Sequence, residues 1–104
     1  MILEHALLTV RPGEQSAFED AMRSAIPLIS ASPGFQDIEV RPAAEESGRY
    51  LLLVRWDDIA SHRDGFRQSD RYSAWRAALH HFYDPMPDVV YFGDSIIDSI
   101  DPAG

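Results

Sequence analysis

His62 is the side chain of this sequence whose surroundings point most directly to chemistry. It lies three residues after Ile59 and four before Phe66, so on a helix the three share one apolar face. Such a face turns toward the protein interior. A histidine there titrates near neutral pH and could accept a phenolic proton from an aromatic compound. The spacing leaves an alternative open, in which His62 is a buried structural histidine with a backbone or carboxylate partner.

Large apolar side chains near His62 could form the wall of a pocket for a planar ligand. Trp75, Leu79 and Phe82 recur at helical spacing, and two other aromatic residues lie in strand-like segments. We therefore name His62 as the candidate catalytic base and expect a substrate-binding set of Phe66, Trp75, Leu79, Phe82, Tyr91 and Trp56. The alternative is that these side chains simply form the hydrophobic core.

The composition argues against several other kinds of chemistry. The chain has no cysteine and no lysine, which removes thiolate nucleophiles, disulfides, cysteine-based metal sites and lysine Schiff bases. Its four histidines lack a His-x-x-x-His spacing, and His80 and His81 would point about 100° apart on a helix. We expect no metal site, and we expect His80 and His81 at the surface or an interface.

Length and charge limit the class of protein further. A chain of 104 residues has room for one domain, and its net charge of −8 disfavours binding to nucleic acid or to an anionic membrane surface. No apolar run reaches the ~20 residues of a membrane-spanning helix. The first residues lack the pattern of a signal peptide, which predicts a cytoplasmic location.

The hydropathy pattern alternates between strand and helix periodicity in the order βαββαβ. This order predicts an α+β, ferredoxin-like fold with a four-stranded antiparallel sheet. In the second strand we place Phe35 on one face with Asp37, Glu39 and Arg41, a mixed pattern that suits a sheet edge. The predicted strands are 2–10, 35–41, 50–56 and 89–92, with helical segments from 14, from 57 or 58, and from 69 or 70.

Three of the predicted strands are apolar on both faces, although right-handed crossovers place both helices on the same face of the sheet. The other face would expose more apolar surface than a monomer usually leaves in water. The sequence therefore predicts a homodimer that packs sheet against sheet. Arg55 interrupts the apolar third strand and is expected to pair with a carboxylate across that dimer, or to hold an anionic ligand.

Over residues 2–95 the sequence resembles the antibiotic biosynthesis monooxygenase family of dimeric α/β-barrel proteins. The resemblance is carried by several short pieces that occur in a fixed order rather than by one diagnostic motif. These pieces are Pro12-Gly13, Ser32-Pro33-Gly34-Phe35, the run from Tyr50 to Trp56, the run from Ser69 to Arg76, and Pro87 before the last strand.

The resemblance implies a dimeric α/β barrel that oxidises a small electron-rich aromatic substrate with dioxygen, without a cofactor. Haem is not expected, because the positions at which haem-degrading relatives carry a tryptophan and a histidine ligand hold Phe66 and Arg76 here. Residues 1–95 would form the domain, and 96–104 a tail that contacts a partner subunit. Two other readings stay open: a non-enzymatic dimeric domain that binds a small ligand or only assembles, and an isomerase- or dehydratase-like proton transfer at His62.

Overall fold

The fold is described from a computed structural model, which covers residues 1–97. Its elements follow the predicted βαββαβ order, with a short π-helical segment before the second helix and a 3₁₀ turn after it. They are β1 (Ile2–Thr9), α1 (Gln15–Ser30), β2 (Phe35–Pro42), β3 (Arg49–Trp56), η1 (Ser61–Phe66), α2 (Asp70–Leu79), η2 (His80–Phe82) and β4 (Val90–Phe92).

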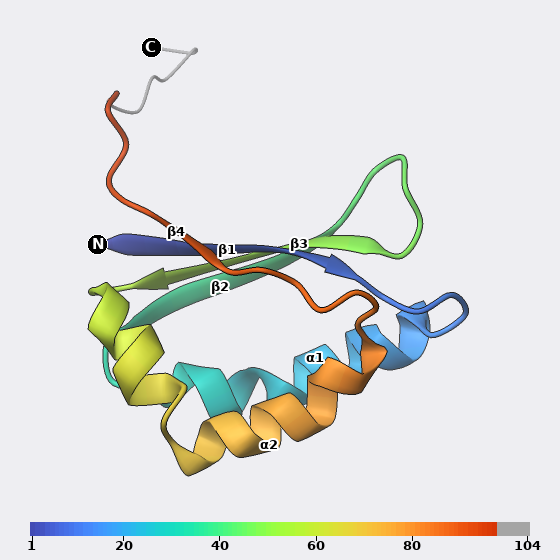
Figure 1. Ribbon diagram of the computed structural model, residues 1–104, viewed down its shortest axis with the longest axis horizontal. Coiled ribbons are helices and arrows are strands. Elements are labelled where there is room, and N and C mark those ends of the chain that lie inside the picture. The colour runs from blue at the N-terminus through green and yellow to red at the C-terminus, as the bar shows by residue number, and fades with distance from the viewer. Residues whose placement is uncertain (98–104) are drawn as a thin grey trace.

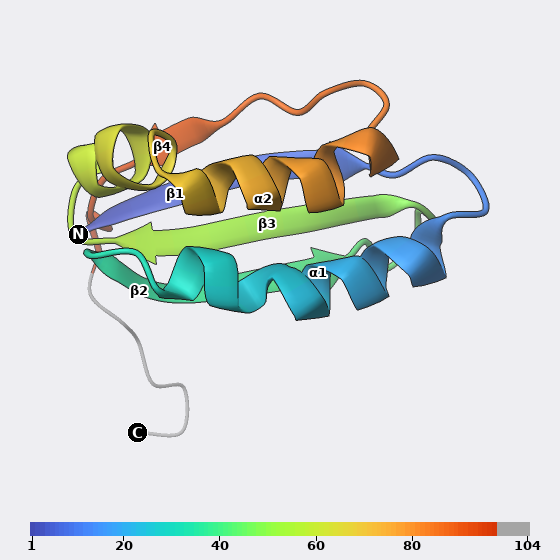
Figure 2. The same ribbon diagram turned by 90° about the horizontal axis from the view of Figure 1, so that it is seen from below.

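The four strands form one antiparallel sheet in the order β2-β3-β1-β4. Both long helices cover the same face of this sheet, and the other face carries no helix or strand from residues 1–97 (Figures 1 and 2). The predicted α+β, ferredoxin-like fold is therefore confirmed, including the edge position of β2. The two central strands, β1 and β3, pair with each other along their whole length.

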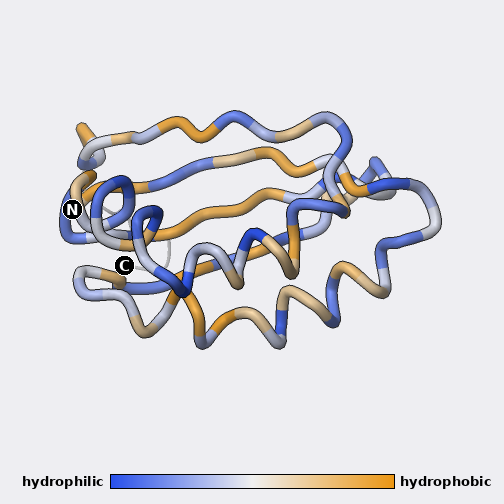
Figure 3. The backbone as a smooth tube through the Cα atoms, turned by 60° about the horizontal axis from the view of Figure 1, so that its bottom comes forward, coloured by the Kyte–Doolittle hydropathy of each residue, from blue (hydrophilic) through white to orange (hydrophobic). Residues whose placement is uncertain are grey.

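Side chains of β3 alternate between the two faces, although its sequence is one hydrophobic run (Figure 3). Tyr50, Leu52, Val54 and Trp56 are buried under the helices, where Trp56 packs edge-on against Phe35. The core there contains Phe18, Met22, Ala25 and Ile29 of α1 together with Leu79 and Phe82. The same strand thus supplies side chains both to the core beneath the helices and to the open face of the sheet.

Two expectations about the sheet are corrected. Phe35 faces the helices with Trp56, not the opposite side with Asp37, because the pairing of β2 with β3 is irregular at Gln36 and shifts the register there. Arg55 pairs with Asp37 and Glu39 of the neighbouring strand of its own chain, at 2.9 and 3.4 Å. The carboxylate partners of Arg55 are therefore intramolecular ones.

Apolar side chains occupy the open face of the sheet. Leu7, Val90 and Phe92 are 48%, 48% and 45% exposed, and the register of β1 with β3 and β4 places Leu3, Leu51 and Leu53 beside them. We call this set the open-face patch. No helix within residues 1–97 is long and apolar enough to cross a membrane. Most of the predicted tail, from 98 onward, lies outside the described residues.

Candidate functional site

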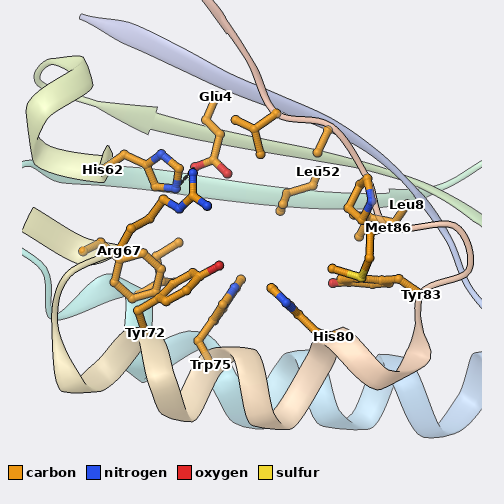
Figure 4. Close-up of a pocket in the computed structure, with 15 residues that line it drawn as sticks. Glu4, Leu8, Leu52, His62, Arg67, Tyr72, Trp75, His80, Tyr83 and Met86 are labelled. Carbon is orange, nitrogen blue, oxygen red and sulfur yellow. Dashed lines mark ion pairs between the residues drawn. The ribbon is translucent and has the colours of Figure 1, made fainter. Parts of the chain in front are cut away.

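A cavity of about 150 Å³ lies between the sheet and the second half of the chain. Leu8 and Leu52 of the sheet lie on one side of it, and Tyr72 and Trp75 of α2 lie on the opposite side (Figure 4). Ala6 and Phe66 also line the cavity. An apolar cavity of roughly this volume is large enough for benzene in another protein. The space beneath the helices is therefore not completely filled by the core, and it matches one aromatic ring.

The position of His62 is set by local helix-capping interactions. The Asp58 carboxylate accepts hydrogen bonds from the backbone N–H and the hydroxyl of Ser61, the first residue of η1, and so caps the helical turn that leads into η1. In η1, His62 and Phe66 are both buried and both point toward the sheet. The side chain of Ser69 then caps α2 by accepting from the N–H of Tyr72. These two caps fix the helical segments that carry the cavity wall.

A buried polar cluster closes one end of the cavity, and we call it the Glu4 cluster (Figure 4). Glu4, only 4% exposed, accepts a hydrogen bond at 2.9 Å from the indole N–H of Trp56 through Oε1. Nε2 of His62 lies 3.4 Å from the same oxygen, and Nδ1 of His62 lies 2.6 Å from the hydroxyl of Tyr91. Both ring nitrogens of His62 thus face protein partners, whereas Oε2 of Glu4 bonds to no residue among 1–97.

Burial changes the protonation of this cluster. It raises the pKa of Glu4 to about 7, although the Trp56 hydrogen bond and the charge of Arg67 act in the opposite direction. It lowers the pKa of His62 to about 4, and the nearby Arg67 adds to that effect. The pKa of the Tyr91 hydroxyl is also raised, first by burial and then by Glu4. At neutral pH the imidazole is uncharged, and Glu4 is the group that exchanges its proton.

With His62 neutral, one tautomer satisfies both of its neighbours. If Tyr91 donates its hydroxyl proton to Nδ1, the remaining N–H is on Nε2 and faces the Glu4 carboxyl group. Arg67 lies at the same end of the cavity, and its guanidinium forms no ion pair with any carboxylate of residues 1–97. A negative charge formed on a ligand at this end would therefore meet a cation.

The opposite end of the cavity holds His80, Tyr83 and Met86 (Figure 4). His80 is half-buried and faces the cavity, which corrects the expectation that it lies at the surface, whereas His81 is exposed as expected. The two differ because successive residues of a helix point in different directions, and here His80 is the one that points toward the cavity. Burial lowers the pKa of His80, with Arg76 and Arg67 adding to the effect.

The structure brings together some of the predicted site residues and separates others. His62, Phe66 and Trp75 line the cavity, whereas Tyr91 does not line it and instead hydrogen-bonds to His62. Trp56 lies behind Glu4 and contributes its indole N–H rather than a stacking surface. Leu79 and Phe82 are buried in the core on the side of Phe18 and do not line the cavity.

Sequence reasoning did not find Glu4, Arg67 or His80 as site residues. For Glu4 a signal was present, since Glu4, Ala6 and Leu8 fall on one alternating set of the first strand, and that set is apolar apart from the acid. An acid on the buried face of a strand is costly without a partner and is therefore informative. Arg67 and His80 lie just past helical segments, where periodicity does not predict direction. Within 1–97 no three His, Asp or Glu side chains gather as a metal site.

The fold and the cavity together define a class of protein: a small ferredoxin-like α+β domain with a ring-sized cavity beneath its helices and a buried carboxyl group in the cavity wall. Comparison with known proteins narrows this class. The family model described as antibiotic biosynthesis monooxygenase matches residues 1–78. This chain therefore belongs to the antibiotic biosynthesis monooxygenase family, and the resemblance seen in the sequence is confirmed.

Individual relatives agree with this assignment. The uncharacterized protein YczJ of Bacillus subtilis (strain 168) is 43% identical over 94 residues, which cover 90% of this chain and 99% of YczJ. The solved structure of an antibiotic biosynthesis monooxygenase homologue from Bordetella bronchiseptica superimposes with a TM-score of 0.86 at 28% identity. The match covers 91% of this chain and 97% of that one. SnoaB, a cofactor-independent oxygenase from Streptomyces nogalater, has the same fold, with a TM-score of 0.81 at 16% identity over 92% of this chain and 94% of SnoaB.

Proposed function

We propose that this protein is a cofactor-independent monooxygenase that oxidises a small electron-rich aromatic compound, a phenol or hydroquinone, with dioxygen. One observation carries the proposal: the carboxyl group of Glu4 is buried in the wall of a ring-sized cavity, and its Oε2 has no partner among residues 1–97. Membership of the monooxygenase family supports the oxygen chemistry. The substrate class is inferred from the size of the cavity and its aromatic walls.

Glu4 suits the role of base better than His62, which the sequence favoured. A general base works best when its pKa lies near the operating pH, and the pKa of Glu4 is about 7 whereas that of His62 is about 4. The free Oε2 could reach a ligand hydroxyl, whereas both nitrogens of His62 face Glu4 and Tyr91. We assign the proton transfer to Glu4 and the orientation of Glu4 to His62.

The reaction balances without an external reductant. Glu4 takes the phenolic proton, and Arg67 stabilises the anion that results. The electron-rich anion passes one electron to dioxygen, and the two radicals combine to form a peroxide at a conjugated ring carbon. The O–O bond then breaks as the proton of that carbon passes to the departing oxygen, so one oxygen atom stays as a quinone carbonyl and the other leaves as hydroxide. Glu4 gives its proton to this hydroxide, which becomes water.

A homodimer in the cytoplasm is the setting that we propose for this activity. The open-face patch is the support for the dimer, because a second copy packed sheet to sheet would remove Leu7, Val90 and Phe92 from water. Packing of this kind leaves the cavity on the helix side of each subunit. Each subunit would therefore carry a complete site.

The test follows dioxygen uptake over a panel of single-ring phenols and hydroquinones, with isotopically labelled dioxygen to trace one atom into the product. Glu4→Gln keeps the acceptor for the Trp56 N–H but removes the base, and we expect it to lower the rate about a hundredfold or more. Glu45→Gln, in an exposed loop, is the matched control and should leave the rate unchanged.

The pH dependence separates the roles of Glu4 and His62. Because the carboxylate is the active form, the wild-type rate should rise with pH through about 7. His62→Gln should lower the rate less than Glu4→Gln and should move the midpoint of the pH profile. Equal rates for wild type and Glu4→Gln would refute the assignment of the base. Binding of aromatic compounds without any dioxygen uptake would instead favour a non-enzymatic ligand-binding protein.

A further inference from the structure

The end of the cavity opposite Glu4 carries polar groups that have no use in the proton transfer. The imidazole of His80 and the hydroxyl of Tyr83 both face the cavity, and their rings lie 5.8 Å apart (Figure 4). Neither side chain forms a hydrogen bond with any residue of the described range 1–97. The polar atoms of both side chains are accessible from the cavity rather than sealed in the core, so they can hydrogen-bond a ligand there.

The charges around His80 indicate which kind of ligand group fits there. Arg67 lines the same cavity, Arg76 lies on the helix before His80, and both disfavour a second positive charge on His80. The packed neighbours of His80 are Tyr72 and Tyr83, which are uncharged rings. A neutral imidazole offers one donor and one acceptor, and so does a tyrosine hydroxyl. This combination matches a neutral hydroxyl or carbonyl oxygen.

The volume of the cavity limits the size of a ligand that could contact both of its ends. At about 150 Å³ it holds one ring, whereas drug-sized ligands occupy about 300 Å³ or more. A ligand that reaches both the Glu4 cluster and His80 must therefore carry its two polar groups on opposite sides of the same ring. A fused second ring would have to displace wall residues such as Trp75, which is buried against Phe66.

We propose that His80, together with Tyr83, is a specificity-determining residue that hydrogen-bonds a neutral oxygen substituent on a single-ring ligand, opposite the hydroxyl that meets Glu4. Only the naming of that hydroxyl as the reacting group rests on the proposed function. The recognition itself is a property of binding. The protein thus selects rings that carry oxygen at both ends over rings that carry it at one end.

The experiment measures binding by calorimetry in the absence of dioxygen, so that no turnover is needed. The two ligands are hydroquinone and 4-methylphenol, which have nearly the same shape and differ in one hydroxyl. Wild type should bind hydroquinone roughly tenfold more tightly, the size expected for one hydrogen bond in a site that leaves its partner otherwise unsatisfied. 1,4-Dihydroxynaphthalene, with a fused ring, should bind more weakly than hydroquinone.

Variants at the two adjacent histidines provide the matched comparison. His80→Phe should bind both ligands equally, and His80→Gln, which keeps a donor and an acceptor, should restore part of the preference. His81→Phe, which changes the exposed neighbour, should keep the whole preference. Circular dichroism checks that each variant is folded, and if His80→Phe is not, His80→Gln alone should show a reduced preference.

Each result has a distinct meaning. A wild type without preference between the two ligands, a wild type that binds neither, or a His80→Phe variant that keeps the preference would overturn the role of His80. A preference that depends on His80 in a protein that takes up no dioxygen would leave this inference intact and would refute the proposed monooxygenase activity.

Discussion

The two faces of the sheet combine charge and apolar surface in opposite ways. Under the helices, the carboxyl group of Glu4 is enclosed by apolar and aromatic side chains, and burial raises its pKa to about 7. On the open face, Arg55 forms ion pairs with Asp37 and Glu39 near solvent, and the Leu7, Val90 and Phe92 side chains remain exposed.

The difference shows that apolar content alone does not distinguish a binding face from an assembly face. Both faces of β1 and β3 are hydrophobic, yet only the helix-covered face holds an ionisable group out of water. A buried group with a shifted pKa beside a cavity is typical of a functional site, whereas an apolar patch with paired charges at its rim is typical of an interface. The predictions below test this division in order of expected effect.

Removing the indole of Trp56 should have the largest effect on folding. Trp56 is fully buried, and its N–H bonds to Glu4, so Trp56→Ala would leave both a large void and an unsatisfied carboxyl group. We expect a loss of about 3–5 kcal/mol in the free energy of unfolding, measured by urea denaturation. Leu53→Ala, on the open side of the same strand, should cost about 1 kcal/mol in dilute protein. Similar losses for the two variants would contradict the division between the faces.

The buried acid should make stability fall as pH rises. The pKa of Glu4 is about 7 in the folded protein against an ordinary value of 4.5, so the folded state binds the proton more tightly between these values. Stability linked to Glu4 is therefore present below about pH 4.5 and is lost as pH rises through about 7, a change of roughly 3 kcal/mol. Glu4→Gln should gain this amount relative to wild type between pH 4.5 and pH 8.

The titration of His62 also contributes to the pH dependence of stability. The pKa of His62 is lowered from 6.5 to about 4, so its contribution has the opposite slope, being present above pH 6.5 and lost as pH falls through about 4. Because His62 lies 3.4 Å from Glu4, the same comparison with His62→Gln is needed to separate the two contributions. Parallel pH curves for wild type and Glu4→Gln would show that Glu4 is not buried as described.

Charge placed on the open-face patch should break the proposed dimer and leave each subunit folded. Phe92→Asp introduces a carboxylate where an exposed aromatic ring lies beside His5. We expect self-association to weaken by about 2 kcal/mol or more, measured by sedimentation equilibrium. Gly93→Asp, at the next position, is the control for added charge. A wild-type protein that is monomeric at micromolar concentration would remove the basis for this prediction.

Loss of the cap on α2 should have the smallest effect, and it should be confined to the cavity side. Ser69→Ala removes the acceptor for the N–H of Tyr72 and should cost about 1 kcal/mol. Because α2 carries Tyr72 and Trp75, ligand binding should weaken while self-association stays the same. Thermal unfolding and calorimetry measure the two effects. A change in the dimer constant would show that the two faces are more tightly coupled than their separation suggests.

Much of the fold was predictable because the signals for it are local. The serine at position 69, the aspartates at 57 and 58 and the switch from alternating to helical periodicity indicated where the helices begin, and the structure confirms caps at Ser69 and Asp58. The mixed character of β2 indicated an edge strand. The register irregularity at Gln36, which turns Phe35 inward, has no local signal, because it depends on pairing with β3.

The candidate site was harder to predict because it depends on contacts between distant segments. His62 could be oriented from its spacing, but its partners Glu4 and Tyr91 come from β1 and β4, which only the sheet brings together. The cavity exists because the side chains of its walls, which come from different elements, leave space between them. The hydrophobic periodicity of a single helix cannot predict such a space. Leu79 and Phe82 share a helical stripe with Trp75, yet they pack past the cavity into the core.

Strand β4 joins the two regions within three residues. Tyr91 points inward to His62, while Val90 and Phe92 point outward into the open-face patch, and within residues 1–97 β4 pairs with β1 alone. Any movement of this short strand therefore displaces the hydroxyl beside His62 and the rings and methyl groups of the patch at the same time. A ligand that moves β4 would therefore be thermodynamically linked to the proposed association of subunits, whereas a change confined to α2, such as Ser69→Ala, would leave the two independent.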